Sequence, residues 1–501
     1  MALSFRELQD DLRRRWHEQE ERGGEGPDAH YDQLVVPSLT MEEHQMQLVT
    51  GVHHYEERQL FNLIRLRHPG VRVVYVTSTL LPELVVDAVL ELLPGMPASH
   101  ARRRLHLFDT NDASPRPLTE KLLERPALLG RLRDQLRPGR SYLTCFTVTA
   151  LEQSLSERLQ VPLLGCDPRL SHWGTKAGSR ELFARCGLPH PPGRRVVFNL
   201  HDLAAAAVDL WESEPGLQRL VVKLNEGFSG EGNALLDLEP LTLAECGPRQ
   251  RLEQVQEALE QLPMPSGHWR ELMGQQGALV EAWLEGGEAC TSPSVQGLIH
   301  PGGRVEVLST HEQRLGGSGG QTFEGCRFPA DAAYRRAVME MGRVVGEALA
   351  AEGALERYAV DVVARRFGDR WDLQAIEINL RQGGTTHPFM ALRHTTSGHL
   401  DPASGAFLAP SGQPLCYEAT DTLCDPRLRG LLPEDLIDLV AEAGLHFDPA
   451  HLRGSLFHLL GCLSQYGKLG MTCIGRSPEE AAAVYRNTQE ALLRGAEALH
   501  A

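Results

Sequence analysis

The sequence has no apolar run long enough to span a bilayer, and its N-terminal stretch, MALSFRELQDDLRRRWHEQEE, is highly charged without an apolar signal core. It also has no surplus of positive charge, because its formal net charge is −16 at pH 7. An acidic chain of this kind is a poor partner for nucleic acid or for an anionic membrane. We therefore expect a cytoplasmic protein with no nucleic-acid partner and no membrane partner.

Two common cofactor signatures are missing as well. The ten cysteines form no CxxC pair and no His/Cys zinc pattern, which favours free thiols in a reducing compartment. Residues 71–95 and 141–165 each contain a β-rich run followed by a helical pattern, but no GxGxxG follows either run. The alternation predicts an α/β layer, and the missing glycines leave a dinucleotide site unsupported.

What the sequence does contain is a strand with polar groups in unusual places, LQAIEINLRQGG at 373–384. Successive side chains of a strand point to opposite faces, so Glu377 and Asn379 share one face. We expect Ile376 and Ile378 on the other face, with Leu380. A buried strand with a carboxylate and an amide on one face, followed by an arginine and two glycines, indicates that these polar groups hold a ligand.

A second carboxylate is expected opposite the first. Residues 358–380 predict two strands joined by a turn at 367–370, and pairing about that turn places Asp361 opposite Glu377. Like charges directly opposed across a strand pair are unfavourable unless a divalent cation lies between them. Asp361, Glu377 and Asn379 thus predict a magnesium–phosphate platform, and the alternative from the hairpin alone is a solvated sheet face.

A glycine-rich loop, NEGFSGEGN at 225–233, predicts a phosphate contact. Glycines allow a backbone to approach a phosphate closely and to donate N–H groups to it. Just upstream, Lys223 interrupts the apolar run LVVKL, where its ammonium either contacts a nucleotide phosphate or extends to solvent. The loop residues that we expect at the phosphates are Gly227, Ser229, Gly230 and Gly232.

A third motif, VEAWLEGGE at 280–288, is consistent with a nucleoside site. The extended backbone of Glu281, Ala282, Trp283 and Leu284 would pair with an adenine edge, and Glu288 would accept the ribose hydroxyls. The alternating polar and apolar residues of a half-buried strand explain the same pattern, so both interpretations stand.

Taken in order, these motifs resemble the ATP-grasp superfamily of carboxylate–amine ligases over residues 173–395. The resemblance implies that Lys176, in GTKAGSR, and Lys223 contact the phosphates of ATP. It implies that residues 281–284 form the adenine hinge and that Glu288 binds the ribose.

The same resemblance implies the metal ligands. Asp361, Glu377 and Asn379 match the acid triplet of the superfamily, and Arg381 matches the arginine that often follows two residues after the asparagine. The implied cofactors are ATP with one or two Mg²⁺ ions, for which Mn²⁺ would substitute. Arg314, in HEQRLGGSGG, and Arg381 would bind the reacting carboxylate and the later oxyanion, because a planar guanidinium suits both. The alternative for Arg314 is an arginine on a surface loop.

A narrower resemblance covers nearly the whole chain. The motifs RPLTEKLLERP (116–126), GTKAGSRELF (174–183), EINLRQGGTTHP (377–388) and YGKLGMTCIGRSPEEA (466–481) are similar to those of pheganomycin-type peptide ligases. This implies an N-terminal helical segment, a pre-ATP-grasp α/β domain, an α+β ATP-grasp core and a small C-terminal domain. We expect these parts at residues 1–60, 61–172, 173–395 and 396–501.

The implied activity is an ATP-dependent ligase that forms an amide or peptide bond. ATP would convert a carboxylate into an acyl phosphate, and an amine would then displace phosphate. The expected partners are an amino-acid-like carboxylate donor and an amine acceptor that is an amino acid or a peptide, and the superfamily makes a homodimer an expectation. The alternatives are a small-molecule kinase on the same fold and a non-catalytic nucleotide-binding protein.

Overall fold

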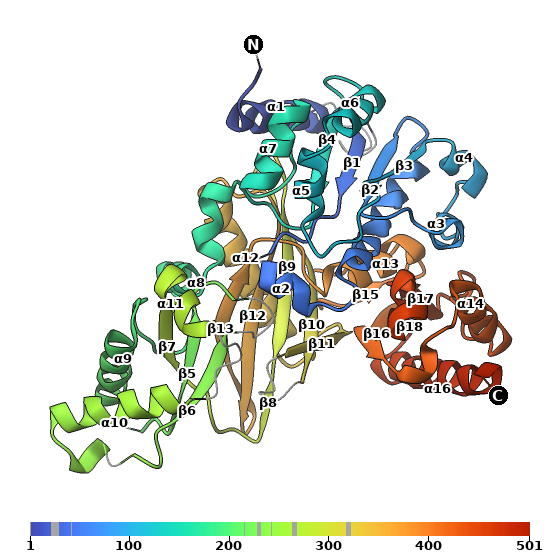
Figure 1. Ribbon diagram of the computed structural model, residues 1–501. Helices are drawn as coiled ribbons and strands as arrows, with labels where there is room; N and C mark the ends of the chain where they lie inside the picture. Colours follow the sequence, from blue (N-terminus) through green and yellow to red (C-terminus); the bar gives the residue numbers. More distant parts are fainter. Residues whose placement is uncertain are drawn as a thin grey trace.

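Three β-sheets and the helices around them organise the computed structural model (Figure 1). The structure describes residues 2–21, 30–41, 43–214, 216–227, 232–241, 243–262, 268–316 and 322–500. The sheets have four, eleven and three strands. No helix within the described ranges is both long enough and apolar enough to cross a membrane.

The first sheet is parallel, in the strand order β3-β2-β1-β4. Apolar side chains from both of its faces pack against helices, which is why its inner strands are buried throughout. The strands are β1 (Asp32–Val36), β2 (Val73–Thr77), β3 (Leu105–Asp109) and β4 (Ser141–Cys145). The helices of this region are α1 (Phe5–Glu21), α2 (Glu43–Leu48), the 3-10 helix η2 (Val52–Arg67), α3 (Glu83–Leu90), α4 (Ala98–Arg102), α5 (Leu118–Leu123), α6 (Pro126–Gln135) and α7 (Ala150–Leu159).

Strand β1 differs from the expectation for the N-terminal segment. The sequence predicts a helical segment over residues 1–60, whereas Asp32–Val36 is an inner strand of the first sheet. The run DQLVV offers only three apolar residues and begins with a carboxylate. Asp32 is fully buried because its carboxylate pairs with Arg137, a partner that local sequence does not show.

The three-stranded sheet has the order β6-β5-β7 and is antiparallel. Helices α9, α10 and α11 pack on it and on one another around Trp269, which is fully buried. The strands are β5 (Arg219–Leu224), β6 (Asn233–Asp237) and β7 (Ala278–Ala282). The helices are α9 (Leu200–Ser213), η4 (Leu243–Glu245), α10 (Pro248–Gln261) and α11 (Trp269–Gln276).

The eleven-stranded sheet follows the order β13-β12-β9-β10-β11-β16-β15-β14, with β8 beside β12 and with β18 and β17 continuing from β16. Helices α12 and α8 cover one face of it through an apolar core that includes Val360 and Val362. Its first seven strands are β8 (Ala289–Thr291), β9 (Pro293–Ile299), β10 (Val305–Gly316), β11 (Thr322–Phe328), β12 (Glu356–Phe367), β13 (Arg370–Asn379) and β14 (His399–Leu400). The associated helices are η3 (Pro168–Gly174), α8 (Lys176–Arg185), α12 (Arg335–Ala351) and α13 (Thr386–Thr396).

The C-terminal segment extends the large sheet instead of forming a sheet of its own, because β11 pairs with β16. One apolar core joins this segment to the first sheet, with Tyr75 of β2 and Met471 of β18 in the same cluster. The remaining strands are β15 (Phe407–Leu408), β16 (Pro414–Cys424), β17 (Gly454–His458) and β18 (Lys468–Gly475). The helices are η5 (Pro426–Leu428), α14 (Pro433–Glu442), η6 (Leu460–Cys462), α15 (Leu463–Tyr466) and α16 (Pro478–His500).

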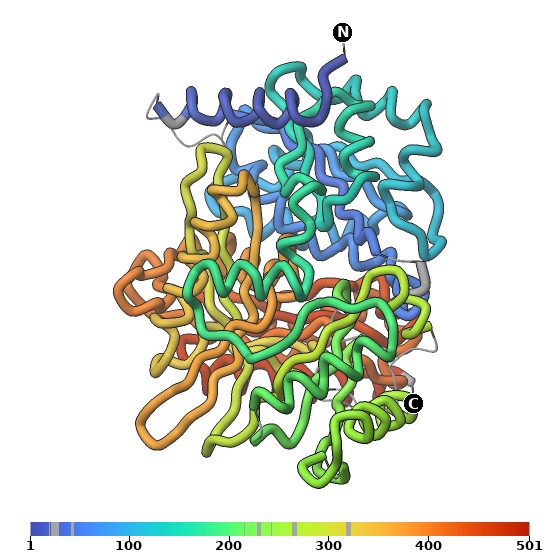
Figure 2. The backbone as a smooth tube through the Cα atoms, turned by 90° about the vertical axis from the view of Figure 1, so that its left-hand side faces the viewer, coloured from blue at the N-terminus to red at the C-terminus, as the bar shows by residue number. Residues whose placement is uncertain are grey.

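Two perpendicular views show how these parts are arranged. In both, the blue and teal N-terminal segments lie at the top and the green segment with α9 and α10 lies at the bottom, with the large sheet between them (Figures 1 and 2). Because of this central position, the large sheet presents residues toward both the first sheet and the three-stranded sheet. The four-part division of the chain stays a prediction.

Candidate active site

A cleft of about 970 Å³ collects residues from the eleven-stranded sheet, the three-stranded sheet and the N-terminal helices α2 and η2. The predicted site residues that line it are Lys223, Glu281, Ala282, Trp283, Leu284, Arg314, Asp361, Glu377, Asn379 and Arg381. The predicted residues with a described position outside its lining are Lys176, Gly227, Gly232 and Glu288. Two others, Ser229 and Gly230, lie outside the described residues. The cleft thus brings the expected hinge, one expected phosphate lysine and the expected metal ligands together.

The β12–β13 hairpin carries the two opposed carboxylates. Asp361 pairs directly with Glu377, as the sequence predicts, and Ala359 pairs with Asn379. Val362, however, pairs with Ala375, so the register shifts and Ile376 is the extra residue of a β-bulge. The bulge places Ile376 in the cleft lining beside Glu377, so its expected place on the opposite face is wrong. A bulge inserts one residue into a strand and re-aims its side chain, which strict alternation does not predict.

The electrostatics of Asp361 fit a cation-binding position. Removal from bulk water, followed by repulsion from Glu377, raises the pKa of the Asp361 carboxyl to about 7. Gln313 Nε2 donates to its Oδ1 at 2.6 Å, and Asn379 Nδ2 donates to its Oδ2 at 3.0 Å. Among the described residues, no group of three or more His, Cys, Asp or Glu side chains is arranged so that it could hold a metal ion by itself. Two carboxylates and one amide nevertheless fit Mg²⁺, which takes a few protein oxygens and completes its shell with phosphate and water.

Lys176 reaches this pair from the start of α8, where Thr175 caps the helix by accepting from Gly178 N. Its Nζ lies 2.5 Å from Glu377 Oε1, although the residue is outside the cleft lining. The backbone of Lys176 also donates to the carbonyl of Asn225 at 3.0 Å. Lys176 therefore links Glu377 to the first residue of the glycine-rich loop.

Lys223 does not extend to solvent. It is 5% exposed, and its Nζ donates to Glu281 Oε2 at 2.6 Å, while Arg180 Nη1 donates to Glu281 Oε1 at 3.1 Å. Burial alone would raise the pKa of the Glu281 carboxyl, but Lys223 and Arg180 hold that pKa below its ordinary value. The apolar run around Lys223 therefore carries a buried charge that Glu281 of the adjacent strand neutralises.

Of the glycine-rich loop, Gly227 and Gly232 are described. Gly232 has φ +88°, and a Cβ there would lie 2.9 Å from the side chain of Leu224. Its carbonyl accepts from Trp269 Nε1 at 3.0 Å. Gly232 is thus required by the turn that leads into β6, whatever else the loop binds. A phosphate contact by Gly227 and Gly232 stays a prediction.

The expected adenine hinge leaves the end of β7 and enters the cleft. The N–H of Trp283 donates to the carbonyl of Arg219 at 3.2 Å, which holds this segment beside β5. Glu288 follows Gly286 and Gly287, both with positive φ, and its carboxylate is 60% exposed and 3.2 Å from Arg366. A ribose contact by Glu288 stays a prediction, because in this structure its side chain pairs on the sheet surface.

Both predicted arginines line the cleft but differ in their surroundings. Burial lowers the pKa of Arg381, and the nearby carboxylates Glu377 and Asp361 oppose that shift. Arg314 lies on strand β10 and not on a surface loop. Its Nη1 donates to Glu418 Oε1 at 2.6 Å, and its guanidinium lies 5.3 Å from the centroid of the Tyr485 ring. Arg381 is therefore beside Glu377 and Asp361, and Arg314 faces the C-terminal strands and α16.

Comparisons with known proteins agree with this geometry. Residues 168–264 match the family model described as IQCH-like, ATP-grasp, and residues 435–488 match the PGM1 C-terminal domain. The chain is 30% identical over 473 residues to L-propargylglycine–L-glutamate ligase of Streptantibioticus cattleyicolor, covering 92% of this chain and 94% of that protein. The chain belongs to the ATP-grasp carboxylate–amine ligases. This confirms the predicted α/β class with an ATP-grasp core and the predicted assignment as a carbon–nitrogen ligase.

Two more distant relatives extend the comparison. IQ motif-containing protein H of Danio rerio is 24% identical over 496 residues, and the match covers 89% of this chain but 46% of that protein. The biotin carboxylase domain of 2-oxoglutarate carboxylase from Hydrogenobacter thermophilus superposes with a TM-score of 0.55 at 14% identity, covering 92% of this chain and 90% of that one. At this identity the likeness establishes the shared fold.

This ATP-grasp ligase also has a polar cluster in the cleft that sequence reasoning missed, formed by Tyr55, Arg58, Asp421 and Lys468. Arg58 Nη1 donates to Asp421 Oδ2 at 3.1 Å, and Lys468 Nζ donates to Tyr55 Oη at 2.8 Å. The residues come from η2, β16 and β18 and share no spacing pattern. The one available signal is Lys468, which lies within the motif YGKLGMTC that the sequence singles out without a role.

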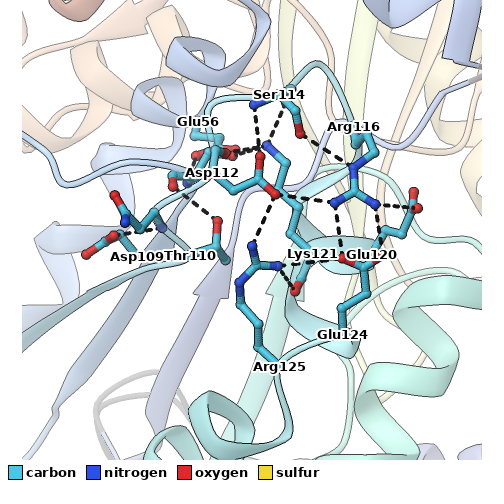
Figure 3. Close-up of polar contacts among 12 residues, drawn as sticks. Glu56, Asp109, Thr110, Asp112, Ser114, Arg116, Glu120, Lys121, Glu124 and Arg125 are labelled. Carbon is cyan, nitrogen blue, oxygen red and sulfur yellow. Dashed lines mark hydrogen bonds and ion pairs between the residues drawn. The ribbon is translucent and has the colours of Figure 1, made fainter.

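A second polar network lies behind η2 and explains the motif RPLTEKLLERP (Figure 3). Lys121 is fully buried, and its Nζ donates to Ser78 Oγ at 2.9 Å and to the carbonyls of Asp112 and Ser114 at 2.7 Å. Ser78 in turn donates to the carboxylate of Glu56 on η2, from its N–H at 2.5 Å and from its hydroxyl at 2.6 Å. The motif therefore ties α5 and the end of β2 to the helix that carries Tyr55 and Arg58.

Proposed function

We propose that this chain activates an amino-acid-like carboxylate as an acyl phosphate and transfers the acyl group to an amine, with release of ADP and phosphate. One observation carries the proposal. The opposed carboxylates Asp361 and Glu377 line the same cleft as the hinge segment, Lys223 and Arg381. A nucleotide at the hinge would thus place its phosphates between two lysines and a cation-binding pair.

The nucleotide would lie along β7 and β5. Backbone groups of 281–284 would meet the adenine edge, and Lys223 and Lys176 would contact the phosphates once a nucleotide draws them from Glu281 and Glu377. Asp361, Glu377 and Asn379 would hold Mg²⁺, which when bound neutralises phosphate charge. A second Mg²⁺ ion and substitution by Mn²⁺ are part of this proposal.

The reaction would proceed in two steps. A carboxylate oxygen attacks the γ-phosphorus, the bond from that phosphorus to the β,γ-bridging oxygen breaks, and ADP leaves. The amine then attacks the acyl carbon, the carbon–oxygen bond to phosphate breaks, and the amine loses a proton. Arg381 would hold the carboxylate and then the tetrahedral oxyanion, because a guanidinium matches both with paired N–H groups. Arg314, which also lines the cleft, would bind the same carboxylate and oxyanion.

The substrates are proposed by class. The relative from Streptantibioticus cattleyicolor is named for two amino acids, propargylglycine and glutamate. We propose an amino-acid-like donor here and an acceptor that is an amino acid or a peptide. A homodimer stays a prediction from the superfamily, and light scattering on the purified chain tests it.

The deciding experiment measures nucleotide products. The protein is incubated with Mg²⁺–ATP and pools of amino acids and short peptides, and ADP, phosphate, AMP and pyrophosphate are quantified. We expect ADP and phosphate in equal amounts, dependent on the pool and lost in Glu377→Gln. Glu340→Gln, an exposed glutamate on α12, is the matched control and should keep full activity. AMP with pyrophosphate would contradict the acyl phosphate, and ADP without free phosphate would indicate a kinase.

A further inference from the structure

The cluster of Tyr55, Arg58, Asp421 and Lys468 is buried within the candidate active-site cleft. Arg58, Asp421 and Lys468 are 7%, 5% and 9% exposed. The guanidinium of Arg58 lies 4.5 Å from the ring centroid of Tyr55 and 4.8 Å from that of Phe146, so two aromatic rings contact the cation. Two cations and one carboxylate are thus held together in a place from which water is largely excluded.

This arrangement is poorly explained as a stabilising ion pair. A buried pair seldom stabilises a fold more than apolar side chains of the same size would, because both charges lose their hydration. Within the described part of the chain, Arg58 Nε is buried and has no acceptor. The cluster has one more cation than carboxylates, so both its charge and its free donor call for an anionic ligand.

The cluster also lies next to the reacting centre. Arg58 covers the ring of Phe146, whose carbonyl accepts from the N–H of Gln382 at 3.3 Å. Gln382 directly follows Arg381, whose pKa is lowered chiefly by burial and to a smaller extent by the charge of Arg58. A ligand on Arg58 would therefore lie beside the carboxylate that Arg381 holds, on the wall formed by η2 and the C-terminal strands.

We propose that this cluster binds the main chain of a free α-amino-acid substrate, with its α-carboxylate on Arg58 and Lys468 and its α-ammonium on Asp421. The inference rests on the proposed function, since it names the class of one substrate of that reaction. An α-amino acid carries opposite charges on groups that share one carbon atom, as Arg58 and Asp421 present opposite charges 3.1 Å apart. Binding would satisfy Arg58 Nε and neutralise the excess cation.

Hydrogen bonds that anchor η2 hold Arg58 of the cluster in place before any ligand binds. Glu56 and Glu57, the residues directly before Arg58, are both anchored by their carboxylates. Glu56 accepts from Ser78, which Lys121 holds; Glu56 and Lys121 are labelled in Figure 3. Glu57 accepts from the N–H of Gly461 at 2.9 Å. A binding group that is held rigid before the ligand arrives loses little entropy on binding. We therefore assign the RPLTEKLLERP network a positioning role for Arg58.

The proposal makes a selectivity prediction. Blocking the α-carboxylate as an amide removes the anion that Arg58 Nε and Lys468 would bind, and N-acetylation removes the ammonium that Asp421 would bind. Removing one member of a buried charge pair weakens binding by at least about 30-fold. We expect free L-amino acids to bind at least about 30-fold more tightly than their amides and N-acetyl derivatives.

The test measures binding separately from turnover. Calorimetry is performed on the full chain with the free amino acid of greatest effect in a thermal-shift screen of the twenty L-amino acids, then with its amide and its N-acetyl form. A fluorescent ADP analogue reports on the nucleotide site. Arg58→Gln and the charge-balanced double variant Arg58→Gln/Asp421→Asn should lose amino-acid binding by at least about 30-fold with unchanged ADP affinity. Arg343→Gln, an exposed arginine on α12, is the matched control.

The outcomes separate this inference from the proposed function. Absence of free amino-acid binding in the screen, amides that bind as well as free acids, or variants that lose ADP and amino acid together would each overturn the amino-acid receptor. Specific amino-acid binding that depends on Arg58, without ADP and phosphate formation, would support the receptor and count against the ligase chemistry. Arg58→Lys should recover part of the affinity, because it keeps the charge.

Discussion

The buried triad of Lys223, Glu281 and Arg180 gives a sharp test of the nucleotide half of the cleft. In Lys223→Met a methionine of similar length replaces the lysine, and Glu281 keeps one cation, Arg180 Nη1 at 3.1 Å. Glu281 Oε2 loses its contact with the Lys223 ammonium at 2.6 Å, and it stays buried because Glu281 is 1% exposed. The variant therefore carries an incompletely neutralised charge out of reach of water.

The expected loss of stability follows from that burial. Breaking a buried ion pair by removing one partner costs about 3–5 kcal/mol. Because Arg180 remains, we expect the lower end, about 3 kcal/mol, which corresponds to a fall in Tm of about 6–12 °C for a cooperative unit of 150–250 residues. ADP affinity should fall as well, because Lys223 is a proposed phosphate contact.

The measurement is thermal unfolding of the wild type, Lys223→Met, Glu281→Gln and the double variant. If the contact is direct, the double variant loses less stability than the sum of the single losses.

The dependence of stability on pH gives a second check. The pKa of Glu281 lies below its ordinary value of 4.5, so the unfolded chain takes up the proton first as the pH falls. The contribution of the pair should be present above pH 4.5 and disappear as the pH falls through the lowered pKa.

A result within about 1 kcal/mol of the wild type for Lys223→Met would refute this reasoning, because that is the value of an exposed, screened pair. It would restore the alternative in which the lysine extends to solvent. Loss of ADP binding without loss of stability would leave the phosphate role intact and remove the structural one.

Three further predictions address other parts of the molecule. Chelation of Mg²⁺ should weaken ADP binding in the wild type, whereas Asp361→Asn should bind ADP with little response to Mg²⁺, as titration with and without EDTA measures. Gly232→Ala should destabilise the fold by about 1–3 kcal/mol in chemical denaturation, because φ is +88° and a Cβ would contact Leu224. Burial lowers the pKa of His311 and His458 to about 3 from 6.5, so the unfolded chain gains protons first below pH 6.5. The free energy of unfolding should fall as the pH drops from 6.5, by up to about 1.4 kcal/mol per pH unit for each histidine, and Tm should fall with it, less steeply in His458→Leu.

The sequence predicts those features that depend on neighbours along the chain. Asp361 and Glu377 are opposite each other because a short turn fixes the pairing of two adjacent strands, and this is confirmed. The bulge at Ile376 is not predictable in this way, because an inserted residue leaves no mark in the alternation of polar and apolar positions.

Other features depend on distant partners and escape local reasoning. Whether Lys223 is buried or solvated depends on Glu281, which is brought beside it by the pairing of β5 with β7. Strand β1 is not recognisable from its own sequence, because the charge of Asp32 is neutralised by Arg137 from another segment. The cluster around Arg58 needs residues from η2, β16 and β18, and no pattern within any one of them indicates a site.

The shared apolar core of the first sheet and the C-terminal segment has a mechanical consequence. Tyr75 and Met471 belong to one apolar cluster, and β16 continues the large sheet. The first sheet, the large sheet and the C-terminal segment are therefore held together by continuous packing and strand pairing. The three-stranded sheet, by contrast, packs chiefly with its own helices. We therefore expect that any widening of the cleft to admit ATP or to release ADP occurs by movement of the three-stranded sheet and its helices relative to the rest of the chain. Deleting the C-terminal strands would remove apolar packing from the first sheet, and it would also remove Lys468 of β18 from the cleft.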